Sequence, residues 1–152
     1  MVHAAHGPAS SDKAQETVRA RKYFTFETDA LVRPWRARRV FLNPPYADGL
    51  IEPFVDKLLA EYRAGNVLEA VLLVDNRTDT IWFHKAARQA AARCDKLSRI
   101  KFRQPDGSGE SPLNGSVFFY YGDNPDRFEA VFGSIGLVYG RPMQVPQLLV
   151  AA

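Results

Sequence analysis

Short apolar runs bounded by turn residues recur along the chain, and they predict the strands of a sheet. The run over residues 67–76 is almost entirely apolar, which is typical of a strand covered on both faces. A second run ends at Asn43, and a third is rich in aromatic residues. In chain order, the predicted strands cover residues 22–31, 39–43, 67–76, 98–103, 116–122 and 137–140.

Amphipathic stretches lie between several of these runs and predict helices. Residues 50–66 place an apolar residue at every fourth position. The alanine-rich stretch 78–97 predicts a second helix, and residues 124–136 predict a short one capped by Asn124 or Asp126. The alternation of strands and helices predicts an α/β fold with right-handed crossovers, in which ligands bind at the carboxyl ends of the strands.

The composition is that of an ordinary globular protein, with 46% hydrophobic and 24% charged residues among 152. This length predicts a single domain over residues 21–152, after an irregular segment at residues 1–20. The only cysteine, Cys94, cannot form an internal disulfide. No apolar run approaches the ~20 residues of a membrane span, and the N-terminus lacks a signal-peptide pattern, so we expect a cytoplasmic protein without a membrane partner.

The net charge of +3 is small, but basic residues gather at residues 19–22, 33–39 and 93–103. Such clusters can hold phosphates, although most charge runs are solvated surface. The Gly/Pro/Ser-rich loop over residues 104–115 is long for a compact domain, which favours a functional or mobile segment. This loop and the run at 33–39 are the candidates for nucleic-acid contact, and plain surface is the alternative for both.

The strand over residues 39–43 runs into an unusual turn, Asn43-Pro44-Pro45-Tyr46. Two successive prolines fix two φ angles and remove two backbone donors, and a residue before proline is held extended. Asn43 Oδ1 and the Pro44 carbonyl can therefore point at one spot, beside the flat face of Tyr46. Two such acceptors would receive a planar group bearing NH₂ and favour the nucleophilic nitrogen that forms during attack. A plain tight turn is the alternative.

These residues resemble the catalytic motif of amino-methyltransferases that use S-adenosylmethionine. More specifically, the chain resembles the phage and prophage Dam-type DNA N6-adenine methyltransferases over residues 20–140. NPPY alone is shared with glutamine and guanine methyltransferases, so the combination of stretches carries the resemblance. In order they are KYFTFETDAL, RVFLNPPYA, VLLVDNRTDTIWFHKA, RIKFRQPDG, GSVFFYYG and RFEAVFGSIGLVYG.

The resemblance implies a methyltransferase that uses S-adenosylmethionine and has a Rossmann-like sheet with helices on both faces. Asn43 and Pro44 would hold the N6 amine of an adenine flipped out of double-stranded DNA, Pro45 would stiffen the turn, and Tyr46 would stack on the base. Asp29 would contact the adenine ring of the cofactor, close to Asn43; its alternative is a turn or cap residue.

The segment Asn76–Thr80 follows a strand and would lie near the same pocket. Thr78 and Asp79 are therefore candidate substrate contacts, with helix capping as the alternative. His84 has no ligand-spaced cysteine, histidine or glutamate around it, so we expect no metal site.

Members of this family have an upstream strand and loop that hold part of the cofactor. The chain begins too soon before Asn43 to contain them in the usual form, so we expect the first strand to be missing, the protein to be N-terminally truncated and cofactor binding to be weak. Two alternatives to DNA adenine methylation stay open. One is methylation of RNA or protein glutamine by the same motif, and the other is a non-catalytic DNA-binding relic.

Overall fold

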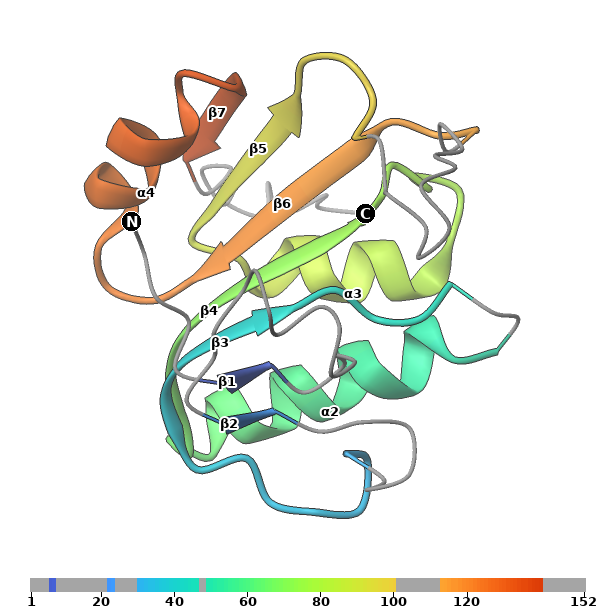
Figure 1. The fold of residues 1–152 in the computed structure, drawn as a ribbon, viewed down its shortest axis with the longest axis vertical. Helices are drawn as coiled ribbons and strands as arrows, with labels where there is room; N and C mark the ends of the chain where they lie inside the picture. Colours follow the sequence, from blue (N-terminus) through green and yellow to red (C-terminus); the bar gives the residue numbers. More distant parts are fainter. Residues whose placement is uncertain (1–5, 8–21, 24–29, 47–48, 101–112, 141–152) are drawn as a thin grey trace, which may run out of the picture.

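The computed structural model describes residues 6–7, 22–23, 30–46, 49–100 and 113–140. Within these ranges, seven strands form one sheet in the order β2-β1-β3-β4-β6-β5-β7 (Figure 1). The strands are β1 (His6–Gly7), β2 (Lys22–Tyr23), β3 (Ala37–Leu42), β4 (Val67–Asp75), β5 (Ala92–Lys96), β6 (Ser116–Tyr121) and β7 (Gly136–Gly140). The helices are α2 (Ile51–Arg63), α3 (Ile81–Gln89) and α4 (Pro125–Phe132).

The sheet is mixed, and its strand directions decide which chain ends meet. Strands β1, β2, β3 and β4 all run parallel to one another, whereas β6 runs antiparallel to both β4 and β5, and β7 runs antiparallel to β5. The carboxyl ends of β3, β4 and β5 therefore share one edge of the sheet with the amino end of β6. We call this the carboxyl edge. The predicted α/β class is confirmed.

Helices cover both faces of the sheet, as predicted (Figure 1). Alternate residues of β4 point to opposite faces: Leu72 packs in a core cluster with α2 and α3, and Leu73 packs in a second cluster with α4. A fully buried tyrosine joins α3 to the sheet, since Tyr121 Oη on β6 donates a 3.0 Å hydrogen bond to the Ala86 carbonyl oxygen. All six residues of β6 are buried, which explains its aromatic sequence.

The predicted helix over 78–97 was wrong in its second half. The helix ends at Gln89, Ala90 is extended, and residues 92–96 form β5. The Ala91 N–H donates to the Tyr120 carbonyl oxygen at 2.7 Å, so the chain has already joined the sheet there. Sheet pairing has overridden the helix propensity of alanine.

The strand predicted at 98–103 was displaced by this change. Residues 98–100 form no strand, and Ser98 has a positive φ of 61° that ends the extended run. Residues 101–103 lie outside the described ranges.

The strand that lies next to β3 on the side away from β4 is short. Strand β1, two residues long, pairs in parallel with β3 through His6 and Val40, and β2 pairs with the other side of β1. The segment 1–20, which we predicted to be irregular, thus contains β1. Of the predicted strand over 22–31, Lys22 and Tyr23 form β2, and residues 24–29 lie outside the described ranges. None of the described helices is long and apolar enough to cross a membrane.

Candidate active site

The Asn43-Pro44-Pro45-Tyr46 turn leaves β3 at the carboxyl edge. Parallel pairing with β4 runs as far as Leu42 and Leu72, and the two prolines that follow have no N–H with which to extend it. Pro44 is buried and Asn43 is half-buried. The prediction that this motif follows a strand is confirmed, although only Val40 and Leu42 of β3 are buried.

Asn43 carries the most informative atom of the site. Its Oδ1 is buried and accepts no hydrogen bond in the structure, the only side-chain oxygen or nitrogen of the described residues with this property. Leaving a buried acceptor unpaired costs about 1–3 kcal/mol. Buried polar atoms without a partner are rare and call for an explanation, and a ligand that donates a hydrogen bond supplies one.

Tyr46 lies against the end of β4, with 38% of its surface exposed. Its hydroxyl donates a long, 3.5 Å hydrogen bond to the Leu73 carbonyl oxygen, just beyond the last residue of β4 that pairs with β3. Burial, and secondly the negative charge of Asp75, raise the pKa of Tyr46 well above its usual value of 10.0. The phenol is therefore neutral at physiological pH and presents an uncharged ring.

Asp75 and Asn114 complete this edge, and neither stood out in the sequence. Asp75 is the last residue of β4 and accepts a 3.3 Å hydrogen bond from Asn114 Nδ2. Next to it, the Asn76 N–H donates to the Gly115 carbonyl oxygen at 2.8 Å. The signal available in the sequence was the polar pair Asp75-Asn76 that closes an apolar run, as Asn43 closes another.

Thr78 and Asp79 are exposed residues just past the end of β4. Asp79 pairs with Arg77 at 3.1 Å, a contact that lowers the pKa of its carboxyl group, and the Thr78 carbonyl oxygen lies 2.9 Å from Nε2 of His84. Neither residue caps α3: Thr80 holds the N-cap position, and its hydroxyl donates to the Arg77 carbonyl oxygen instead. Their role as substrate contacts remains a prediction.

Two residues, Asn43 and Asp29, were predicted to contact the cofactor. Asn43 lies at the carboxyl edge as described above. Asp29 falls outside the described residues, so its role stays a prediction from the resemblance. Within the described ranges, no three histidine, cysteine, aspartate or glutamate side chains lie together so that they could hold a metal ion.

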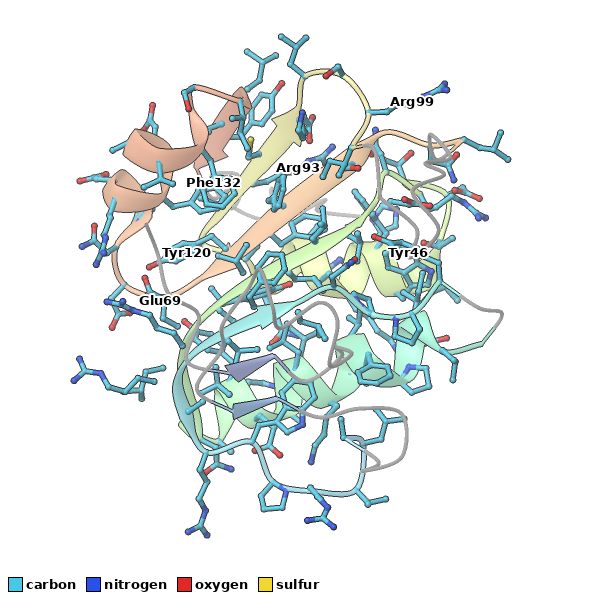
Figure 2. All side chains as sticks on the ribbon, in the orientation of Figure 1. Tyr46, Glu69, Arg93, Arg99, Tyr120 and Phe132 are labelled. Carbon is cyan, nitrogen blue, oxygen red and sulfur yellow. The ribbon has the colours of Figure 1, made fainter. Side chains whose placement is uncertain are left out.

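The basic run at 33–39 lies at the opposite edge of the sheet from Asn43. Its exposed arginines, Arg33, Arg36 and Arg38, precede or begin β3, and the six residues of β3 span roughly 20 Å. Arg39 is paired with Glu69 at 2.9 Å, and Figure 2 shows Glu69 on the other side of the view from Tyr46. This run is therefore poorly placed to hold DNA against Asn43.

The other candidate for nucleic-acid contact is well placed. Residues 104–112 lie outside the described ranges, but Leu113, Asn114 and Gly115 reach the carboxyl edge. Arg99, which follows β5, is exposed on the same edge and is labelled in Figure 2. The last residues of the loop, Leu113 to Gly115, thus lie at the carboxyl edge.

An α/β protein with an NPPY turn at the carboxyl edge of a parallel strand pair fits the class of amino-methyltransferases. A family model described as DNA N-6-adenine-methyltransferase (Dam) matches residues 7–123. The chain belongs to this methyltransferase family, as the resemblance predicted. No curated protein matches the chain. The matched range runs from β1 to just past β6 and contains every candidate site residue, whereas α4 and β7 lie beyond it.

Proposed function

We propose that the protein transfers a methyl group from S-adenosylmethionine to N6 of adenine in double-stranded DNA. The observation that carries the proposal is the buried, unpaired Oδ1 of Asn43 within the NPPY turn. An exocyclic amine donates hydrogen bonds, so adenine supplies the partner that this atom lacks. Family membership favours DNA adenine over other planar amines.

The chemistry follows from the two acceptors. An aromatic amine is a poor nucleophile because its lone pair is delocalised into the ring. Acceptors at Asn43 Oδ1 and at the Pro44 carbonyl would hold the two amine hydrogens as the nitrogen becomes tetrahedral, which is stabilisation of the transition state by fixed dipoles. The bound cofactor would supply the methyl group, so that a C–N bond forms, a C–S bond breaks and N6 loses one proton.

The described residues fit a cofactor at this edge. Strands β1, β2 and β3 run parallel side by side, so their carboxyl ends face the same side as Asn43. Ligands of open α/β sheets bind beyond such ends. This supports a Rossmann-like arrangement in which Asn43 and Asp29 would hold the cofactor and Tyr46 would stack on a base flipped from the duplex.

The direct test is methyl transfer from radiolabelled S-adenosylmethionine to unmethylated duplex DNA, with N6-methyladenine identified after digestion. We expect Asn43→Ala to lower the rate by about a hundredfold or more, because it removes one of the two acceptors that would hold the amine hydrogens. The matched control is Asn124→Ala, the same change at the N-cap of α4, where it removes a helix cap and no acceptor of the site.

Parallel reactions with RNA and with protein separate the alternatives. Label in RNA or in protein glutamine, but not in DNA, would contradict the proposed substrate. DNA binding without transfer to any of the three would indicate a non-catalytic protein. Equal activity of the Asn43→Ala and Asn124→Ala variants would contradict the role given to Asn43.

A further inference from the structure

The acceptor oxygen of Asn43 is buried, which limits how a base in duplex DNA could reach it. A base stacked between its neighbours cannot bring its amine to a buried atom, so the target base has to leave the stack. Its departure leaves a gap, and proteins that open a stack frequently insert an apolar side chain there, which offsets part of the cost. Such a side chain has to project into solvent at the carboxyl edge.

Leu113 is an apolar side chain of this kind. With 89% of its surface exposed, it is the most exposed large hydrophobic side chain among the described residues. It lies shortly before β6, whose amino end shares the carboxyl edge with the ends of β3 and β4. Single exposed apolar residues are common on protein surfaces, so the position and support of Leu113 have to distinguish it.

The backbone that follows Leu113 is tied to the end of β4. Asn114 Nδ2 donates to Asp75 Oδ2 at 3.3 Å, and the Gly115 carbonyl oxygen accepts a 2.8 Å bond from the Asn76 N–H. The leucine is therefore carried on an anchored segment while its side chain stays in water. A side chain held in this way enters a partner with a smaller loss of conformational freedom than one on a free loop.

Two other aliphatic side chains are exposed near this edge, but Leu113 is better placed than either. Leu97 follows β5 and is 77% exposed, and Ile81 begins α3, which covers one face of the sheet. In the strand order β3-β4-β6-β5, only β4 separates β6 from β3, so the two strands lie about 10 Å apart. Leu97 is one strand further from Asn43.

The same edge carries a positive charge for the phosphates of DNA. Arg99 is exposed shortly after β5, and Figure 2 shows it on the same side of the view as Tyr46. A guanidinium group there can neutralise a phosphate next to the opened stack. The exposed apolar side chain and the exposed cation are the two kinds of group that a duplex at this edge would contact.

We propose that Leu113 enters the duplex at the gap left by the flipped adenine and keeps that base outside the stack. This inference rests on the proposed function and deepens it, because it names the side chain that opens the duplex, whereas Asn43 and Tyr46 receive the base. Leu113 takes no part in the chemistry at N6. Its loss should therefore lower the fraction of bound DNA whose target base is flipped.

The first experiment measures single-turnover methylation at a target adenine located by mapping N6-methyladenine in the product duplex. We expect Leu113→Ala to lower the rate by about ten- to fiftyfold, because the contact loses three of the four side-chain carbons. A pyrene nucleotide opposite the target adenine fills the gap itself, so with that duplex the rate should return to within about threefold of wild type. The matched control is Leu68→Ala, an exposed leucine near the amino end of β4, at the opposite edge of the sheet.

The second experiment needs no methyl transfer. Fluorescence anisotropy compares the binding of an intact duplex with that of a duplex in which one base is missing, so that the gap is already present. We expect the wild type and Leu68→Ala to prefer the gapped duplex by about five- to twentyfold, and Leu113→Ala to lose most of this preference.

Equal rates for Leu113→Ala and Leu68→Ala on fully paired DNA would overturn the proposal. A loss of rate that pyrene does not restore would also overturn it, because it would indicate an ordinary contact or a damaged fold. The same loss and rescue in Leu97→Ala, but not in Leu113→Ala, would overturn the assignment to Leu113. If the wild type methylates nothing, the proposed function fails. The preference for the gapped duplex then still decides: its loss in Leu113→Ala supports the insertion, and its absence in the wild type or its persistence in Leu113→Ala overturns it.

Discussion

Glu61 is a buried carboxylate on which three separate segments converge, and its replacement gives a sharp test of the fold. It lies in the last turns of α2 with 6% of its surface exposed. It accepts hydrogen bonds from Lys57 Nζ at 2.6 Å, from Asn66 Nδ2 at 2.7 Å and from the Trp35 N–H at 3.3 Å. Trp35 precedes β3, so this cluster fixes the strand that leads into the Asn43 turn.

The expected loss in the free energy of unfolding depends on how many hydrogen-bond donors lose the charged acceptor at Glu61. Glutamine keeps the shape of Glu61 and one oxygen, but its NH₂ group then faces donors. We expect Glu61→Gln to lower the free energy of unfolding at pH 7 by about 1–2 kcal/mol, and Glu61→Ala by about 2–4 kcal/mol. For a domain of this size, the Gln change corresponds to a fall in Tm of roughly 2–8 °C.

The pH dependence gives an independent reading of the same group. Burial alone would raise the pKa of Glu61, but the bonds from Lys57, Asn66 and Trp35 outweigh it and lower the pKa below the ordinary 4.5. A carboxyl whose folded pKa is lowered stabilises the fold above the unfolded pKa, and this contribution is lost as the pH falls through the folded pKa. Glu61→Gln should therefore lose less stability than wild type between about pH 5 and pH 3.

The measurement is urea unfolding followed by circular dichroism at several pH values. Glu129→Gln, an exposed change on α4, is the control and should match wild type throughout. If Glu61→Gln were as stable as wild type at pH 7 and lost the same stability in acid, the reasoning about this cluster would be refuted.

Two further predictions concern the packing of β7 against β5. Gly136 begins β7 against β5, where an added Cβ would collide with the Asp95 carbonyl oxygen and lie 2.9 Å from Cys94 Sγ. We expect Gly136→Ala to lower the free energy of unfolding, measured in urea, by about 1–3 kcal/mol. An unchanged free energy of unfolding would contradict this packing. Burial, and secondly Asp95, raise the pKa of the Cys94 thiol, so Ellman's reagent should react with it only in urea; rapid reaction of the folded protein would contradict its burial.

The elements that the sequence predicted well are those whose local pattern agrees with their place in the fold. β4 is nearly all apolar because both of its faces are covered. Asn124, one of the two expected caps, is the N-cap of α4, and its side chain accepts a hydrogen bond from the Arg127 N–H. β5 was missed because residues 90–92 are alanines, whose local preference is helical. Its alternating Arg93, Cys94 and Asp95 show the period of a strand, but over too short a stretch to outweigh that preference.

The order of the strands in the sheet could not be predicted from local sequence patterns either. Nothing in the sequence near Asp95 indicates that β6, more than twenty residues later, pairs between β4 and β5. That arrangement reverses β6 and brings its amino end, with Asn114, to the carboxyl edge. The contact between Asp75 and Asn114 spans 39 residues, so only the folded sheet reveals it.

The residues of the candidate site also differ in whether the local sequence could predict them. Asn43 to Tyr46 was predictable because the chemistry of that turn is local: the prolines set the backbone, and the strand before them sets the burial. That burial leaves Asn43 Oδ1 without a partner, at a cost of about 1–3 kcal/mol in a domain whose whole stability is of order 5–15 kcal/mol. Since no side chain among the described residues offsets that cost, while Tyr46 beside it hydrogen-bonds to β4, the unpaired oxygen supports the proposed role of the turn as a receptor for an amine.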